Sequence, residues 1–211
     1  MPEKAAQKEP GKKPVPSKKP KPQQEVVVQI PLSELHPFPD HPFQVREDAS
    51  MQETAESVKE YGVLVPALAR PREDGGYELI AGHRRKHACE LAGLATMPVI
   101  VRDIDRDTAT IIMVDSNLQR ENILPSERAK AYKMKMEAIK RQGARTDLTS
   151  PKISAKFRSD DEVGQDAGVS GDTIRNYIAL TQLVPELQQM VDEKKIALSP
   201  AYQIAALTPK E

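Results

Sequence analysis

The stretch Leu79-Ile80-Ala81-Gly82-His83-Arg84-Arg85-Lys86-His87-Ala88 passes from a strand pattern into a helix pattern and determines how the first half of the chain is interpreted. Gly82 stands at the junction, where it lets the backbone turn and approach a ligand closely. The first turn of the helix offers unpaired N–H groups and the positive end of the helix dipole. Basic side chains are unfavourable there unless an anion binds, so the stretch predicts a phosphate site made of Gly82, His83, Arg84, Arg85 and Lys86. The alternative is an ordinary basic helix start on the surface.

The remainder of the first half predicts a mixture of strands and helices. Ser50-Met51-Gln52-Glu53 has the pattern of a capping box, and Gly62 ends the helical spacing that follows it. The prolines between 36 and 43 indicate an extended segment or loop, and the turn residues at 73–76 predict a hairpin. The expected strands are 25–30, 63–69, 77–81 and 97–101, and the expected helices are 51–61, 82–92 and 106–115.

The second half predicts helices only. Pro125 suits a first helical position, and we expect the helix behind it to end at Gly143. Its apolar stripe leaves the lysines on the opposite face; the stripe consists of Ala129, Tyr132, Met136 and Ile139. Shorter helices are expected near 152–157, 161–167, 171–182 and 186–195 and from 199 onward. The fold class is therefore α+β, with a small mixed α/β domain at 25–120 and a helical domain at 121–211.

A helix-turn-helix is indicated at 161–180. Gly164, Gly168 and Ile174 have the spacing of its small residue, turn glycine and core residue, and Ser170 is placed to cap the second helix. The side chains expected in the major groove lie early in that second helix; they are Asp172, Thr173, Arg175 and Asn176. An ordinary helical hairpin with a glycine turn is the alternative.

The zero net charge hides two basic segments. Residues 1–24 contain seven lysines, two glutamates and six prolines, which predicts a disordered basic tail, serving either as a solubilising leader or as a tether for an acidic partner or nucleic acid. Residues 128–158 carry ten basic and two acidic side chains, the footprint of a double-stranded DNA contact. Lys152 and Lys156 are the candidate phosphate ligands of this segment. A solvated helix face is the alternative.

Composition excludes several classes of protein. The single cysteine, Cys89, rules out an intrachain disulfide or a cysteine-rich zinc site and fits a reducing, cytoplasmic compartment. The longest nearly apolar run, 61–69, is too short to cross a bilayer, and the N-terminus lacks the apolar core of a secretory signal, so no membrane partner is expected.

The order of motifs resembles the ParB family of DNA-partition proteins from about Ile30 to Ala206. The junction at 82–88 is similar to the family's G-E-R-R-x-R-A, and Asn117-Leu118-Gln119-Arg120-Glu121 follows it. His41-Pro42-Phe43-Gln44-Val45-Arg46 is similar to N-P-x-Q-x-R, and Tyr61-Gly62-Val63-Leu64-Val65-Pro66 to the G-x-x-Q-P element.

The resemblance implies a dimeric DNA clamp that closes on binding CTP, reads a palindromic site and associates with the nucleoid. It also implies a partner ATPase of the ParA type and a separate C-terminal dimerisation domain. The residues beside the nucleotide would be Gly62, Pro66, Asn117, Arg120 and Glu121, together with those of the junction. The chain ends at Glu211, so we expect either a fragment or a shorter member of the family.

Three departures concern the chemistry of the implied site. His83 and His87 replace a glutamate and an arginine, Val65 replaces a glutamine, and Ser116 stands where the family has a glutamate linked to its metal. Serine cannot supply a carboxylate to Mg²⁺, although Asp115 is adjacent. The sequence therefore predicts nucleotide binding and leaves CTP hydrolysis and a role for Mg²⁺ open.

Two other functions remain as alternatives. One is a transcriptional regulator that works without a nucleotide. The other is a nucleotide-dependent enzyme such as a phosphotransferase, because the implied α/β fold resembles sulfiredoxin and certain kinases. Cys89 lies inside the helix and not before the His-Arg pair, so we expect it to be a small buried apolar residue rather than a nucleophile.

Overall fold

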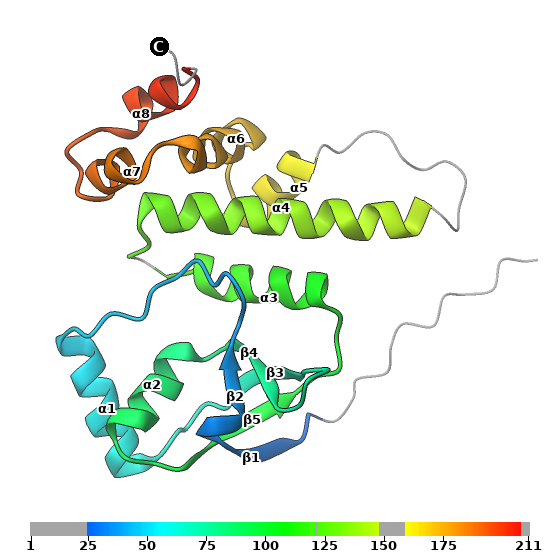
Figure 1. The fold of residues 1–211 in the computed structure, drawn as a ribbon, viewed down its shortest axis with the longest axis vertical. Coiled ribbons are helices and arrows are strands. Elements are labelled where there is room, and N and C mark those ends of the chain that lie inside the picture. The colour runs from blue at the N-terminus through cyan, green and yellow to red at the C-terminus, as the bar shows by residue number, and fades with distance from the viewer. Residues whose placement is uncertain (1–24, 121, 148–158, 208–211) are drawn as a thin grey trace, which may run out of the picture.

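The computed structural model describes residues 25–120, 122–147 and 159–207. An α/β layer is stacked against a helical layer (Figure 1). The sheet of the first layer consists of β1 (Val27–Pro31), β2 (Leu35–Pro37), β3 (Ala67–Pro71), β4 (Tyr77–Ala81) and β5 (Thr96–Val101), in the order β1-β5-β3-β4-β2. Strands β1 and β5 are antiparallel, as are β3 and β4, whereas β3 runs parallel to β5 and β2 parallel to β4. The sheet is thus mixed, as the short hairpin and the longer crossovers require.

Helices cover both faces of this sheet. The helices α1 (Ala49–Tyr61) and α2 (His83–Leu91) pack on one face, and α3 (Arg106–Leu118) packs on the other (Figure 1). Successive side chains of β4 therefore enter two different cores: Leu79 belongs to the cluster of α1 and α2, and Ile80 to the cluster of α3. Because both faces of β4 are covered, Leu79 and Ile80 are both completely buried although they point in opposite directions.

The helical layer begins with the long α4 (Pro125–Asp147), which lies along the outer side of α3 (Figure 1). It is followed by α5 (Ser159–Ala167), α6 (Gly171–Ala179), the 3₁₀ turn Leu180–Gln182, α7 (Pro185–Asp192) and α8 (Leu198–Ala205). This arrangement confirms the predicted fold class, a mixed α/β region followed by helices only. The predicted tail at 1–24 and the helix near 152–157 lie outside the described residues.

The segment 36–43, expected to be extended or looped, begins inside the short strand β2, which pairs in parallel with β4. One local prediction in the α/β region was wrong. Helix α1 is capped by Asp48 and not by Ser50: the Asp48 carboxylate accepts from Met51 N at 2.9 Å. Asp48 satisfies the N–H group of Met51, whereas a capping box starting at Ser50 would have satisfied that of Glu53.

Two predictions about α4 were also wrong. The helix does not end at Gly143 but continues to Asp147, since one glycine costs a helix only about 1 kcal/mol. Lys135 is not on a solvated face: its side chain is 1% exposed, and its Nζ donates to Asp115 Oδ1 at 2.6 Å. This ion pair joins α4 to α3 and explains why a charged residue is tolerated between the two helices.

Gly82 has a packing role at the start of α2. Its φ is +112°, and a Cβ added to it would lie 2.8 Å from the Cβ of the completely buried Ala67 on β3. The absence of a side chain therefore lets the start of α2 lie directly against the sheet.

We predict that Gly82→Ala lowers the free energy of unfolding by about 2–4 kcal/mol, since backbone strain and overpacking add at this position. Gly93→Ala is the matched control, because Gly93 also has a positive φ, +72°, but no atom lies within 4 Å of the position that an added Cβ would take. Denaturant titration followed by circular dichroism measures both. Equal losses in the two variants would contradict the close-packing role of Gly82.

Candidate functional site

A cavity of about 570 Å³ lies where the β2–α1 loop, the start of α2 and the α3–α4 connection meet. We call it the arginine cavity, because three arginines line it. Its lining residues are Phe43, Gln44, Arg46, Asp48, Ser50, Arg84, Gln119, Arg120, Asn122, Ile123 and Glu127. Several guanidinium groups around one open space form a site suited to a phosphate or another polyanion.

Arg84 is the junction arginine that the structure places in this cavity. Its Nη2 lies 3.2 Å from Ser50 Oγ and 3.8 Å from an oxygen of Asp48. The Asp48 carboxylate is half-exposed and also caps α1, so it balances the charge of Arg84 only in part. An entering anion could therefore bind Arg84 without displacing a buried partner.

Arg85 points elsewhere. Its Nη1 donates to Val65 O at 2.6 Å and to Pro66 O at 2.7 Å, and it does not line the arginine cavity. Burial lowers the pKa of Arg85 from its ordinary value. The expected pair of junction arginines is thus divided: Arg84 faces the cavity, and Arg85 fastens the Gly62–Pro66 segment to α2.

The other residues predicted in that segment and junction also lie outside the cavity lining. Gly62 ends α1 with a φ of +72°, and Pro66 contributes the carbonyl bound by Arg85. Lys86 Nζ is bonded to Glu90 at 2.5 Å, which satisfies one basic charge within the helix.

The ring of His83 packs against that of His41 from the β2–α1 loop, with the two ring planes tilted by 44°. The two ring centroids are 3.9 Å apart, and the Nε2 atoms of both rings are buried without a hydrogen-bond partner among the described residues. Burial first, and then the charges of His41, Arg120 and Lys86, lower the pKa of His83 to about 3. Burial likewise lowers the pKa of His41. Both imidazoles are therefore neutral at pH 7, and His83 adds no positive charge to the junction.

Arg120 and Asn117 differ in exposure, since the side chain of Arg120 is partly accessible to solvent and that of Asn117 is buried. Arg120 lines the cavity, and its pKa is lowered by burial and next by the charge of Arg84. Asn117 is 2% exposed, and its Nδ2 donates to Met113 O at 2.8 Å, while its Oδ1 has no partner among the described residues. The predicted residue Glu121 lies outside the described residues.

The residues near Asn117 do not fit a Mg²⁺ ion held by the protein. Asp115 is paired with Lys135, and Ser116 Oγ donates to Met113 O at 3.0 Å. Within 25–120, 122–147 and 159–207, no group of three histidine, cysteine, aspartate or glutamate side chains is arranged to hold a metal ion. A single amide oxygen is a weak donor set for this cation, which prefers six oxygen ligands.

Cys89, considered above for an enzymatic role, is completely buried in the core of α1 and α2. Burial is also the main reason why the pKa of its thiol is raised. Such a thiol is a poor nucleophile at pH 7, and the expectation of a small buried apolar residue is confirmed.

The helix-turn-helix geometry expected from 161–180 is present in α5 and α6. A Cβ on Gly164 would lie 2.6 Å from Val169 O, so only glycine allows the turn to approach α5. Gly168 has a φ of +69°, and Ser170 caps α6 by accepting from Thr173 N at 3.2 Å. Ile174 is completely buried against Tyr132 of α4, as its position in the motif requires.

The residues predicted to contact bases differ in whether their side chains are free to reach DNA. Asp172 and Asn176 are exposed, and Thr173 is partly exposed. Arg175, however, is bonded by its guanidinium to Asp160 of α5 and to Asp172. The predicted phosphate ligands Lys152 and Lys156 lie outside the described residues.

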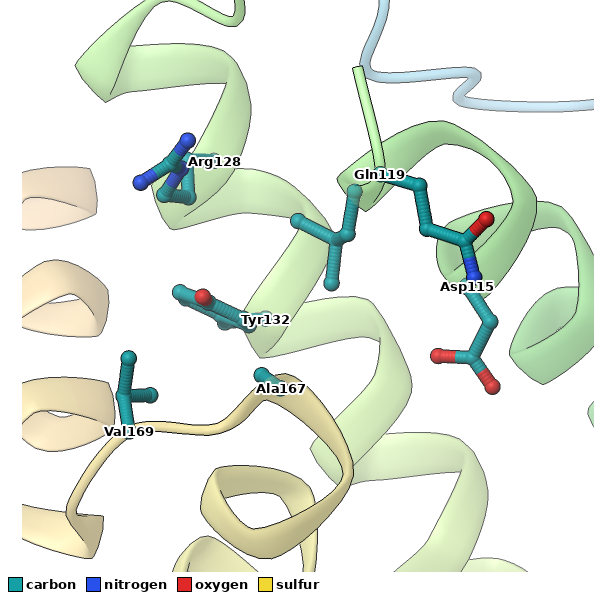
Figure 2. A pocket seen from close by; sticks show the side chains of 7 residues that line it. Asp115, Gln119, Arg128, Tyr132, Ala167 and Val169 are labelled. Atoms are coloured by element: carbon teal, nitrogen blue, oxygen red, sulfur yellow. The ribbon is translucent and has the colours of Figure 1, made fainter. Parts of the chain in front are cut away.

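A second cavity, of about 640 Å³, separates α3 from the helix-turn-helix (Figure 2). Asp115 reaches it from α3, Gln119 from the residue that follows α3, Arg128 and Tyr132 from α4, and Val169 from the α5–α6 turn, as Figure 2 shows. Arg128 also lies over the ring of Tyr177, 5.6 Å from its centroid. This basic residue is held beside α6 by a cation–π contact rather than by a carboxylate.

Sequence reasoning did not single out several polar residues of the arginine cavity, namely Gln44, Arg46, Asp48, Asn122 and Glu127. Arg46 belongs to the quoted N-P-x-Q-x-R-like stretch, which was used only for the resemblance. Glu127 stands three residues after Leu124 at the start of α4, the spacing of a capping glutamate, and this spacing could have indicated that its side chain turns back toward the connection.

No helix in the described part of the chain is both long and apolar enough to cross a membrane.

Two family models match the chain. The model of the ParB N-terminal domain matches residues 16–118, and that of the ParB HTH domain matches residues 151–211. The chromosome-partitioning protein Spo0J of Thermus thermophilus is 34% identical over 186 residues, which are 88% of this chain and 62% of that protein. The chain therefore spans less than two thirds of the length of this relative.

Two solved structures of a C-terminally truncated chromosome-partitioning protein ParB from Caulobacter crescentus are also similar. The one complexed to the centromeric parS site is 27% identical, covers 86% of each chain and has a TM-score of 0.55. The one complexed with CTP-gamma-S is 28% identical, covers 87% of this chain and 93% of that chain, and has a TM-score of 0.42.

We predict that His83 makes the folded protein less stable in acid. Because its pKa falls from 6.5 to about 3 on folding, only the unfolded chain binds this proton between these values. The free energy of unfolding contributed by His83 therefore decreases as pH falls from about 6.5 toward 3, with a slope of at most about 1.4 kcal/mol per pH unit.

Denaturant titrations at pH 7.5, 6.5, 5.5 and 4.5 test this prediction by comparing the wild type with His83→Gln. The slope should be shallower in the variant, since glutamine does not titrate. Parallel pH dependences in the two proteins would show that His83 binds its proton equally in both states.

Proposed function

The chain belongs to the ParB family, and on that premise we propose that it is a sequence-specific DNA-binding protein of DNA partition whose α/β domain binds CTP. The proposal depends on one observation: the same chain has a cavity lined by three arginines and, packed on the helix α4 that begins at this cavity, a helix-turn-helix formed by α5 and α6. CTP is the nucleotide that the family resemblance implies.

The division of labour follows the two layers. We assign nucleotide binding to residues 25–120 and DNA binding to residues 121–211, with 1–24 as a basic tail that reaches a ParA-type ATPase or DNA. Arg84 and Arg120 would bind the triphosphate by charge-assisted hydrogen bonds. The Gly62–Pro66 segment, fastened by Arg85, would lie beside the base.

The DNA partner is double-stranded, and α6 is the helix proposed to enter the major groove. The solved Caulobacter relative complexed to the parS site supports DNA as the partner. Asn176 and Thr173 could contact base edges directly, whereas Arg175 must first exchange its carboxylate partners for a base. Two protomers would close around one duplex as a clamp in the nucleoid.

A regulator that binds DNA without a nucleotide is the second candidate. It is favoured by the position of Arg85, which is committed to the carbonyls of Val65 and Pro66 and so does not add its charge to the cavity. Hydrolysis of CTP is not part of the proposal, because the residues around Asn117 do not form a metal site.

We predict that Arg84→Ala reduces the affinity for CTP by at least tenfold, since a charge-assisted bond to a phosphate contributes about 1.5–3 kcal/mol. Isothermal titration calorimetry with CTP and ATP measures this loss and the preference for cytosine. Arg72→Ala, on the β3–β4 hairpin outside the cavity lining, is the control and should bind CTP like the wild type. Equal heats for Arg84→Ala and the wild type would refute the assignment.

We predict that Arg175→Ala relaxes discrimination at one base position by about 1–3 kcal/mol. A binding site is first selected from a randomised duplex library, and single-base variants of it are then titrated against the wild type and Arg175→Ala. A uniform loss of affinity for all duplexes would instead make Arg175 a phosphate contact.

A further inference from the structure

Glu127 places a buried carboxylate inside the arginine cavity. It is 7% exposed and lines the cavity together with Arg84 and Arg120. Its Oε1 accepts a hydrogen bond from Gln44 N at 3.1 Å, and its Oε2 accepts one from Leu124 N at 3.3 Å. Both oxygens are thus engaged by backbone N–H groups, which fix the side chain in one position.

These two donors come from different parts of the fold. Gln44 belongs to the β2–α1 loop that borders the cavity and lies 83 residues away in the sequence. Leu124 immediately precedes α4, and its bond to Glu127 is the glutamate half of a capping box. Glu127 therefore ties the wall of the cavity to the first turn of α4.

The same turn of α4 is bonded to the helices that follow it. Ser126 N lies 2.9 Å from one carboxylate oxygen of Asp192 in α7, and Ser126 Oγ lies 2.5 Å from the other. One turn further on, Tyr132 packs on Ile174 of α6. A shift of the first turn of α4 would consequently move the helix-turn-helix relative to the sheet.

A polyanion in the cavity would act directly on Glu127. The carboxylate supports the charge of Arg120, whose pKa it raises against the effects of burial and of Arg84. A bound triphosphate would compete for Arg120 and would add several negative charges near a carboxylate that water screens poorly. Loss of Arg120 as a partner and repulsion by the phosphates both favour movement of the Glu127 side chain away from the cavity, which would break its bonds with the N–H groups of Gln44 and Leu124.

We propose that Glu127 is a positioning residue that couples a nucleoside triphosphate in the arginine cavity to the placement of α4, and thereby to the affinity for DNA. This inference rests on the proposed nucleotide function. The coupling is reciprocal: if the nucleotide changes the affinity for DNA, DNA changes the affinity for the nucleotide by the same factor.

Glu127→Gln tests the proposal in the full chain, because it keeps the shape of the side chain and removes its charge. CTP affinity is measured by calorimetry, and DNA affinity is measured on the selected duplex with and without CTP. We expect the variant to bind CTP roughly fivefold or more tightly. We also expect the ratio of its two DNA dissociation constants to move toward one. Glu137→Gln, an exposed change on the same helix, should match the wild type in both respects.

The outcomes separate this inference from the function on which it rests. If the wild type binds no CTP, the nucleotide part of the proposed function fails. If the wild type binds CTP but its DNA affinity does not respond, the coupling is overturned. If the wild type responds and Glu127→Gln gives the same CTP affinity and the same ratio, the role of Glu127 is overturned.

A second measurement needs no variant. Amide hydrogen exchange of the wild type, followed by nuclear magnetic resonance, reports on the N–H groups of Gln44 and Leu124. Saturating CTP should speed the exchange of both amides, because their acceptor is withdrawn. Unchanged or slower exchange in CTP-saturated protein overturns the proposal, whether or not Glu127→Gln folds.

Discussion

The packing of α3 between the sheet and α4 is the constraint on which the rest of the structure depends. Ile80 of β4, Met113 of α3 and Ala131 of α4 are completely buried in one continuous cluster. The pair of Lys135 and Asp115 adds a polar bond across the same helix interface. Because close-packed side chains interdigitate in few arrangements, the position of α4 relative to the sheet follows from that of α3.

The arginine cavity is a consequence of this stacking. Arg84 comes from the sheet side, Arg120 from the connection that leaves α3, and Glu127 from the beginning of α4. The protein keeps these charges in partial balance: Asp48 lies near Arg84, and Glu127 supports Arg120. The cavity lining thus has more basic than acidic side chains, and the two carboxylates offset its positive charge only in part.

In the helix-turn-helix, too, a basic side chain is balanced by nearby carboxylates. Arg175 is held by Asp160 and Asp172, so the proposed contact with a base would have to replace existing ion pairs. Such an exchange would reduce the net gain in affinity from the contact, but it would penalise any duplex that cannot offer a matching acceptor, because the guanidinium would then lose partners without replacement.

The sequence by itself determined the elements whose signals are local. The strand Tyr77–Ala81, the glycine at its end and the turn around Gly164 and Gly168 all follow from apolar runs and from backbone conformations that only glycine adopts readily. The family resemblance rested on the same short motifs, and the fold class followed from their order.

Tertiary structure alone decided where the polar side chains point. Arg84 and Arg85 are neighbours with the same chemistry. Arg84 nevertheless faces the cavity, whereas Arg85 binds the two backbone carbonyls that immediately precede β3. Lys135 lies in a basic run that the sequence places on the face of the helix opposite its apolar stripe, but α3 covers it and supplies Asp115. Long charged side chains can reach in several directions, and only partners distant in sequence, brought close by packing, select one of them.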